Sequence, residues 1–452
     1  MAIVTNKFKR ETIQLIKDNF DSSENHYYIG IGRSDVWNST DTAPDAYANL
    51  KEERLFRNSL QSVKKVGDLS FVVPRNNWSS GTVYSAYSDN LVVNYPTQHP
   101  YYVMNDNNQV YICIQQSKSA TGATVASTIQ PSGNTSGTTF VTSDGYAWKF
   151  LYSISALDAS KYIAANFIPV KKQIGSGSQA SDTEQLAVQN ASVDGEIIGY
   201  NVDSGGEGYS STPTLTIVGD GTLAKAVAAI SGTSITKVDV QDSASTLCLG
   251  SGYTNAIVTQ SGGSPTKPAK ITPIFAPRGG LGHDPRADLR SNGVMLTIKP
   301  DGTENNDFVV GNDFRQVGLV RNMLDSASGV KFTASTGIAL KQLVFASGGA
   351  TFTADKVMVG TSSTAKGVID KVDGNNIWYH QNDETGYRNF EHNEAVTENG
   401  GSGSGQLVNN ASTYLVNPEV GTTTGDLLYI DNRAAVTRAS DQTEDIKIVI
   451  QI

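Results

Sequence analysis

A chain of 452 residues is too long for one hydrophobic core, so we expect roughly two to four domains. Its 43 glycines and its charged fraction of only 17% favour turns and strands over helices. The net charge of −9 argues against a nucleic-acid groove, because such a groove needs a basic stripe to displace counterions.

Neither a secretory leader nor a membrane-spanning segment is expected. The first ten residues lack the apolar stretch of a signal peptide. No apolar run approaches the ~18 residues that a membrane helix needs. We therefore expect a protein that is made in a cytoplasm and is not inserted into a membrane. The only cysteines, Cys113 and Cys248, are far apart, which favours two free thiols over a disulfide and leaves no zinc motif.

The first 170 residues predict a mixed region that begins with a helix. Residues 5–20 place Phe8, Ile13, Ile16 and Phe20 at helical spacing, which predicts one apolar face. The other elements expected here are a helix at 46–60 and strands at 27–32, 69–73, 91–93, 101–104, 109–115 and 147–154. Pro74 should end the strand before it. The last two strands are expected to pair across a polar loop at 117–143.

The middle of the chain contains a duplicated motif after a linker predicted at 171–184. Gly205–Tyr209 precedes a predicted strand at 213–218, and Gly250–Tyr253 precedes another at 256–259. A Gly-Tyr turn allows positive φ at glycine while the ring folds back over the strands. These features predict an inserted β-domain at 185–270.

The second half of the chain predicts further strands and a second insert. Strands are expected at 293–298 and 314–320, and two similar segments at 357–369 and 395–408 flank a hairpin with Asp373-Gly374 at its tip. The last strands are expected at 426–433 and 446–452. Alternating isoleucines from Ile446 to Ile452 predict that the end of the chain is tied into a sheet.

The predicted fold class is therefore mainly β. An α+β frame with one N-terminal helix would carry nested antiparallel β-domains rich in Gly, Ser and Thr. The frame is predicted at 1–170, 273–324 and 413–452. The inserts are predicted at 185–270 and 325–412.

No catalytic, cofactor or metal site is predicted. The chain has no nucleophile elbow, zinc-protease helix, phosphate-binding loop or dinucleotide fingerprint. His283 and Asp284 stand between Gly282 and Pro285, which is more typical of a turn than of a catalytic pair. Asp301, Glu304 and Asp307 could ligate Ca²⁺, but they lack the glycine and final glutamate of an EF-hand loop, so a solvated turn is favoured. The paired carboxylates of a glycosidase remain an alternative that spacing alone does not decide.

Seven short motifs follow one another in the chain. They are IGRSDVW at 31–37, VVPRNNW at 72–78, YICIQ at 111–115, DGYAWKFLYSI at 144–154, FRQ at 314–316, YIDNR at 429–433 and DQTEDI at 441–446. In order and content they resemble the baseplate wedge protein family (the gene eight products) of T-even-like contractile-tailed bacteriophages. That family reads G-R-S-x-x-W, I-P-R-x-x-W, Y-x-C, D-G-Y-x-W, F-R-Q, Y-x-E-N-R and D-Q-T-E-E-I. The resemblance covers parts of 1–170 and 273–452, and the two inserts have no counterpart in it.

The resemblance implies a structural subunit of the virion, without enzymatic activity or cofactor, assembled in the host bacterial cytoplasm. It would form a homodimer within each baseplate wedge and contact other wedge subunits and the short-fibre attachment protein. It would rearrange when the tail contracts. The candidates for holding the frame or an interface are Arg33, Trp37, Arg75, Trp78, Trp148, Phe314, Arg315 and Arg433. For each of them, packing within the frame is at least as good an interpretation as contact with a partner.

Two other functions fit parts of the pattern. A receptor-binding or glycan-binding tail adhesin would use the Gly-Tyr β-repeats as adhesive modules and would be trimeric. Aromatic residues such as Tyr84, Tyr87 and Trp378 could then stack on sugar rings, although packing in a core is commoner for them. A polysaccharide-degrading enzyme would need two carboxylates in a cleft.

Overall fold

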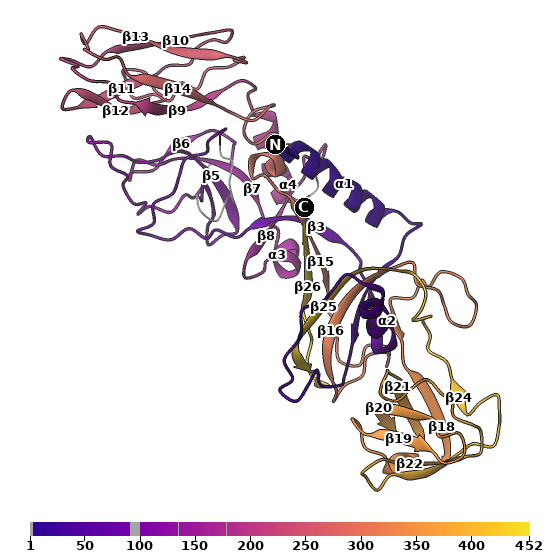
Figure 1. Cartoon of the computed structure of the whole chain (residues 1–452). Helices are drawn as coiled ribbons and strands as arrows, with labels where there is room; N and C mark the ends of the chain where they lie inside the picture. Colours follow the sequence, from indigo (N-terminus) through magenta and orange to yellow (C-terminus); the bar gives the residue numbers. More distant parts are fainter. Residues whose placement is uncertain (1–2, 91–99, 134, 178) are drawn as a thin grey trace. The chain divides into compact units, whose positions relative to one another are not determined.

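The computed structural model describes residues 3–90, 100–133, 135–177 and 179–452. These residues are 38% strand and 11% helix, in several antiparallel sheets with an N-terminal helix (Figure 1). The predicted fold class is therefore confirmed. The strand predicted at 91–93 lies outside the described residues.

Five α-helices are described; α1 and α2 correspond to the two predicted helices, and the other three were not predicted. They are α1 (Asn6–Asp21), α2 (Leu50–Asn58), α3 (Ala156–Tyr162), α4 (Ala180–Asn190) and α5 (Pro285–Asp288), with a 3-10 turn at Gly349–Thr351. The Asn49 side chain accepts hydrogen bonds from the backbone N–H groups of Lys51 and Glu52, both at 3.0 Å. This cap starts α2 later than predicted. Helix α4 begins inside the predicted linker at 171–184, so the linker prediction is wrong at its end.

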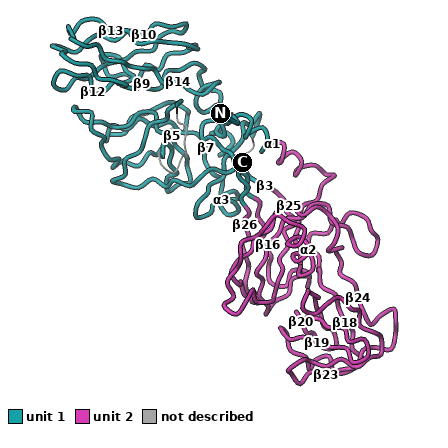
Figure 2. The backbone as a smooth tube through the Cα atoms, in the orientation of Figure 1, with its two compact units in different colours: residues 1–14, 70–295, 449–452 teal, residues 15–69, 296–448 magenta. Residues whose placement is uncertain are grey.

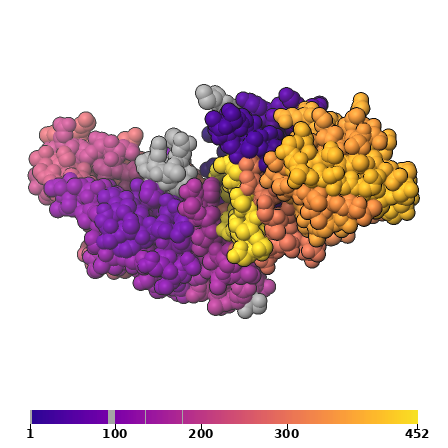
Figure 3. Space-filling model, turned by 90° about the horizontal axis from the view of Figure 1, so that it is seen from below, coloured from indigo at the N-terminus to yellow at the C-terminus, as the bar shows by residue number. Residues whose placement is uncertain are grey.

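Helix α1 confirms the predicted helix but not the whole of its apolar face. Ile13 and Phe20 are buried, whereas Phe8 is 62% exposed. The first described residues of the chain, indigo in Figure 3, lie at the surface. The prediction that Phe8 belongs to the buried face is therefore wrong, because a helical spacing does not say how far along the helix its covering extends.

The chain divides into two compact units (Figure 2). Unit 1 contains residues 1–14, 70–295 and 449–452, and unit 2 contains residues 15–69 and 296–448. The frame and the two inserts predicted from the sequence stay a prediction, because the division into two compact units does not test their boundaries.

One sheet of unit 1 is built on the aromatic motifs. It has the order β4-β5-β7-β6, with β4 (Tyr102–Met104), β5 (Gln109–Gln115), β6 (Phe140–Val141) and β7 (Ala147–Ser153). Strands β5 and β7 are antiparallel with Tyr111 opposite Phe150, which confirms the predicted pairing. Trp148 is fully buried and belongs to an apolar cluster on this sheet.

The Gly-Tyr segment of unit 1 consists of three antiparallel strand pairs. They are β9 (Ile197–Ser204) with β14 (Lys270–Phe275), β11 (Val227–Ser231) with β12 (Ser234–Asp239), and β10 (Thr214–Gly219) with β13 (Ala256–Ser261). The strands that follow the two motifs therefore pair with each other.

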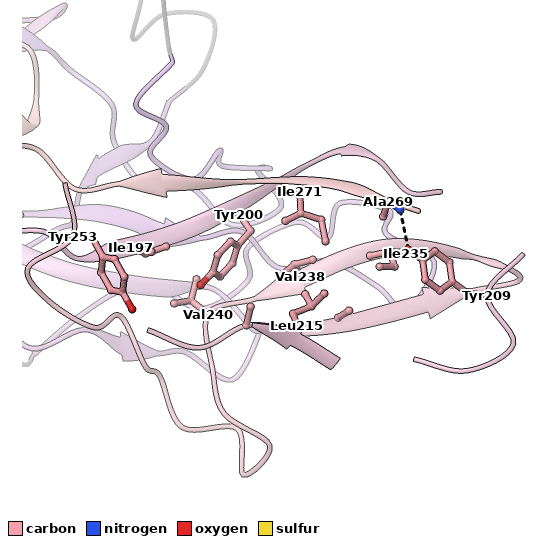
Figure 4. Packing of buried hydrophobic residues seen from close by; sticks show 12 residues of the cluster. Ile197, Tyr200, Tyr209, Leu215, Ile235, Val238, Val240, Tyr253, Ala269 and Ile271 are labelled. Atoms are coloured by element: carbon pink, nitrogen blue, oxygen red, sulfur yellow. Dashed lines mark hydrogen bonds between the residues drawn. The ribbon is translucent and has the colours of Figure 1, made fainter. Parts of the chain in front are cut away.

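Both Gly-Tyr turns have the predicted conformation. Gly208 has φ of 79° and Gly252 has φ of 75°. The rings of Tyr209 and Tyr253 fold into the buried cluster between the strands (Figure 4). The Tyr209 hydroxyl accepts a hydrogen bond of 2.8 Å from the backbone N–H of Ala269. Tyr209 precedes β10 and Tyr253 precedes β13, and the two strands are antiparallel. The duplicated motif thus places one core tyrosine near each end of this strand pair.

A four-stranded sheet has the order β26-β15-β3-β8, with β26 (Ile446–Gln451), β15 (Gly293–Ile298), β3 (Leu69–Pro74) and β8 (Phe167–Val170). The division into units passes through β15 between Met295 and Leu296 and through β26 between Ile448 and Val449. Pro74 is the last residue of β3, as predicted. Ile446 and Ile448 are buried, but Ile452 is 38% exposed, so the predicted apolar alternation is wrong at its last residue.

The main sheet of unit 2 has the order β17-β2-β1-β16-β25. Its strands are β17 (Thr336–Ile338), β2 (Leu60–Lys65), β1 (Tyr27–Gly32), β16 (Asp313–Arg321) and β25 (Asp426–Thr437). Gly30 stands opposite Gly318 where the ring of Phe56 from α2 covers the sheet. A Cβ at Gly318 would overlap that ring, so the glycine allows α2 to pack closely.

The remaining strands of unit 2 form a barrel that we call the barrel segment, residues 341–416. Its order is β21-β20-β19-β22-β23-β18-β24, and β21 also pairs with β18, so the first six strands close on themselves. The strands are β18 (Lys341–Ser347), β19 (Val357–Gly360), β20 (Lys366–Asp373), β21 (Asn376–His380), β22 (Ala395–Glu398), β23 (Ser404–Leu407) and β24 (Leu415–Val416). The predicted hairpin is confirmed, with Asp373 opposite Asn376 and φ of 58° at Gly374.

Candidate functional site: a polar joint in unit 2

Three of the sequence motifs lie on adjacent strands of the main sheet of unit 2. Gly32 at the end of β1 stands opposite Gln316 of β16, and Gln316 stands opposite Asn432 of β25. The Gln316 side chain donates a hydrogen bond of 2.8 Å to the Asn432 side chain. Motifs that are about 280 and 120 residues apart in the chain are thus joined by one row of contacts across the sheet.

The first motif forms a compact turn directly after β1. Arg33 has φ of 61°, and its guanidinium carbon lies 4.2 Å from the ring centroid of Trp37. The Trp37 indole donates a hydrogen bond of 2.9 Å to the backbone carbonyl of Arg433. Burial lowers the pKa of Arg33. The Arg433 side chain is exposed, so this residue contributes its backbone rather than its charge.

Arg315 binds the turn after β1 through ion pairs and a hydrogen bond. Its side chain is 4% exposed and forms ion pairs with Asp41 at 2.8 Å and Asp313 at 2.9 Å. It also donates a hydrogen bond to the backbone carbonyl of Ser34. Burial alone would lower the pKa of Arg315, but the hydrogen bond to Asp41 and the charges of both carboxylates raise it. The neighbouring Phe314 is buried in the sheet.

A buried histidine links the same turn to the barrel segment. His380 Nδ1 lies 2.7 Å from Asp370 Oδ2, and His380 Nε2 lies 3.3 Å from Asp35 Oδ2. The Ser34 hydroxyl donates to Asp370 Oδ1 at 2.8 Å, and the Asn312 side chain donates to the Asp370 carbonyl at 2.8 Å. We call His380, Asp370, Asp35, Ser34 and Asn312 the polar joint.

The charge of the imidazole determines how the polar joint is held together. Burial alone would lower the pKa of His380, but the negative charge of Asp370 and the hydrogen bonds to Asp35 and Asp370 raise it to about 10. The ring is therefore protonated at neutral pH and donates from both nitrogens, one to each carboxylate. Burial opposes the charge of Asp35, yet its hydrogen bond from His380 keeps its pKa below the ordinary value.

The polar joint does not have the arrangement of a serine nucleophile with its base. The Ser34 hydroxyl bonds to Asp370, whereas both histidine nitrogens face carboxylates. In a serine–histidine pair, a ring nitrogen faces the hydroxyl and takes its proton. The cluster therefore binds two parts of the chain to each other.

A groove of about 720 Å³ lies beside the polar joint. On one side it is lined by the turn after β1 and by β16, and on the other by the barrel segment. Its charged lining residues are Arg33, Asp35, Asp313, Arg315, Asp355, Lys366, Asp383 and Glu384.

The other predicted frame residues, Arg75, Trp78 and Trp148, lie in unit 1 and contact residues of that unit. Arg75 donates to the Asn77 side chain at 3.0 Å and to the Ala164 carbonyl at 3.1 Å. The Trp78 indole donates to the Ser127 hydroxyl at 3.1 Å. The Trp148 ring stacks on Tyr146 with a centroid distance of 5.7 Å. The predicted set is thus divided, with Arg33, Trp37, Phe314, Arg315 and Arg433 in unit 2.

Residues that the sequence offered for a metal site or an acid–base pair form contacts of other kinds. Asp284 accepts a hydrogen bond from the backbone N–H of Arg286 at the start of α5 and pairs with its guanidinium at 3.2 Å. Glu304 pairs with Lys64 at 2.5 Å. Within the described ranges, no group of three or more His, Cys, Asp or Glu side chains is placed to hold a metal ion. Cys113 and Cys248 are both free, but only Cys113 is buried.

The part of the chain that the structure describes contains no helix long and apolar enough to cross a membrane. No protein-family model matches the chain, and no curated protein matches it significantly.

Sequence reasoning did not find the polar joint. His380 and Asp370 lie outside the seven motifs, so no pattern in the sequence marked them. The available signal was Ser34-Asp35 inside the first motif, because a short polar pair between a buried strand and a tryptophan needs partners. The sequence could not show that those partners lie more than 330 residues away.

Proposed function

We propose that this chain is a structural subunit of the baseplate wedge of a contractile bacteriophage tail. The observation that carries the proposal is the row of contacts from Gly32 to Gln316 and Asn432. Three motifs on which the resemblance depends are neighbours in one sheet. Residues that act together in one structural element are the kind that a family of structural proteins retains.

The roles of the motif side chains also support a structural subunit. Arg315 and Trp37 form hydrogen bonds within the chain, and Trp148 is part of a core. The polar joint binds two parts of unit 2 without activating a nucleophile. We propose that the protein forms a homodimer, contacts other wedge subunits and the short-fibre attachment protein, and is incorporated into the tail baseplate after synthesis in the host cytoplasm. On tail contraction it would rearrange through its interfaces.

Two measurements test this function. The mass of the purified full chain is measured by light scattering over a concentration series, and the chain is then co-expressed with the proposed wedge partners. We expect a dimer that co-purifies as part of a wedge complex. A stable trimer that binds no baseplate protein would contradict the proposal and favour the tail adhesin. A monomer that also fails to co-purify with those proteins would contradict it as well.

A further inference from the structure

The barrel segment and the main sheet of unit 2 have separate cores. Leu343, Ile369 and Val396 belong to one buried cluster inside the barrel. Tyr28 and Phe56 belong to another cluster between the sheet and α2. The two clusters share no residue. A segment with its own core and a separate neighbour can move as a body if the contacts between the two allow it.

The contacts of the polar joint cross from the sheet to the barrel. Ser34, Asp35 and Asn312 belong to the sheet side, and Asp370 and His380 belong to the barrel side. Each member is a polar or charged side chain that bonds to a member on the other side. Polar networks of this kind are sensitive to the loss of one partner, because the remaining groups are then buried without a bond.

The groove provides space beside these contacts. Val36 of the turn and Lys366 of β20 line it from opposite sides, and both side chains are exposed. The sheet and the barrel are therefore bound by the buried polar joint, and the groove lies next to it. Two exposed contacts also join α2 to the barrel segment: Arg54 pairs with Asp383 at 3.4 Å, and the Asn58 side chain donates to the Tyr387 hydroxyl at 2.7 Å. Rotation about the joint would narrow or widen the groove without breaking either core.

We propose that the polar joint is a latch, which fixes the barrel segment against the main sheet and, when opened, lets the barrel rotate into the adjacent groove. The latch concerns motion inside one chain. Its test therefore uses the isolated protein and does not depend on the proposed function.

The charged groups that face His380 determine when the latch is closed. Asp370 comes from β20 and Asp35 from the turn after β1, while Arg33 lies beside Asp35. Asp313, Arg315 and Asp355 surround these groups and interact with one another electrostatically. Because Asp370 and Asp35 raise the pKa of His380, the latch is closed at neutral pH and loses its central charge only in alkaline solution.

A pair of spin labels across the groove measures the motion. The labels are attached to cysteines in the double variant Val36→Cys, Lys366→Cys of the full chain, with Cys248→Ser to remove the half-buried thiol; Cys113 is fully buried. Pulsed electron–electron distances are recorded for this protein, for His380→Gln and for the matched control His392→Gln. His392 is an exposed histidine of the same barrel, outside the joint.

We expect one narrow distance distribution for the parent and for His392→Gln. His380→Gln should give a distribution that is broader by about twofold, because opening replaces one arrangement by several. The parent, but not His380→Gln, should broaden as the pH rises above 9, around the pKa of about 10. A distribution in His380→Gln that stays as narrow as in the parent would overturn the latch.

Amide hydrogen exchange separates an open latch from an unfolded barrel. In His380→Gln we expect faster exchange in the turn at 33–38, while β19, β22 and β23 keep their protection. Loss of protection in those three strands would show that the histidine only supports the fold, and would overturn the proposal. Should His380→Gln not fold, Ser34→Ala removes a single hydrogen bond of the joint and is expected to broaden the distribution to a smaller degree; no change there would have the same negative meaning.

Discussion

The arginine–tryptophan motifs at 33–37 and 75–78 look alike in the sequence but have different surroundings. In unit 2 the Arg33 guanidinium lies over the Trp37 ring, and the indole bonds to a backbone carbonyl beside an open groove. In unit 1 the side chains of Arg75 and Trp78 have separate partners, and Trp78 packs against an apolar cluster. A shared composition therefore does not imply a shared role.

The two regions are stabilised by different interactions. The motifs of unit 1 surround a core of stacked and edge-on aromatic rings, which is stabilised mainly by burial. The motifs of unit 2 surround ion pairs and hydrogen bonds that need all their partners. Substitutions that remove apolar volume should act most on unit 1, and substitutions or pH changes that remove a charge should act most on unit 2.

The largest effect is expected from Trp148→Ala. The side chain is fully buried among Tyr84, Tyr146 and other rings, so its removal leaves a cavity that should cost about 4 kcal/mol of unfolding free energy. Trp37→Ala, the control in unit 2, should cost about 1 kcal/mol because it removes one hydrogen bond and one cation–π contact. Urea unfolding followed by peptide-resolved hydrogen exchange measures both. Equal costs would remove the distinction between the two regions.

Arg315→Met should have the next largest effect. The variant leaves Asp41, Asp313 and the Ser34 carbonyl without their cation, at a cost of roughly 3 kcal/mol. Arg321→Met is a control on the same strand, since Arg321 pairs with Asp426 at the surface and should cost less than about 1 kcal/mol. The same unfolding measurement compares them. If Arg315→Met were as mild as the control, the ion pairs would not stabilise the turn.

The pH dependence of stability should differ between the units. Burial raises the pKa of Asp288 in unit 1 from 3.8 to about 8. The folded state then keeps a proton that the unfolded state releases, so stability should fall as the pH rises from about 4 to about 8. His380 in unit 2 has its pKa raised from 6.5 to about 10, so its contribution is complete below pH 6.5 and is lost as the pH rises through 10.

Two variants assign these pH windows. Asp288→Asn should flatten the decline between pH 4 and 8 in unit 1, and His380→Gln should flatten the decline between pH 6.5 and 10 in unit 2. Unfolding free energies are measured at intervals from pH 4 to 11, with exchange of the peptides of each unit. A decline that persists unchanged in either variant would mean that other groups cause it.

The smallest effects are expected from exchanging each tryptophan for phenylalanine. Trp37→Phe removes the hydrogen bond to the Arg433 carbonyl, and Trp78→Phe removes the bond to the Ser127 hydroxyl. Each should cost about 0.5 kcal/mol, because only one hydrogen bond is lost and an aromatic ring stays in place. Chemical unfolding of both variants gives the comparison. A much larger cost for Trp78→Phe would show that its ring shape, rather than its hydrogen bond, stabilises unit 1.

The sequence by itself determined most of the local structure. Alternation of apolar residues predicted β5 and its pairing with β7, and the glycines before Tyr209 and Tyr253 predicted two turns with positive φ. These features depend on neighbours within a few residues or on one hairpin, so a local pattern contains the information. The start of α2 was missed because a cap by Asn49 competes with the helical pattern before it.

Only the tertiary structure decided which residues meet. His380, Asp370 and Asp35 come together because β20 and β21 place the first two on one hairpin and the barrel brings that hairpin to the turn after β1. Phe8 is exposed although its spacing matched the buried residues of α1, since burial depends on whether other segments pack over that turn of the helix. The topology of the fold determines which distant polar residues become partners, and a local sequence pattern does not contain that information.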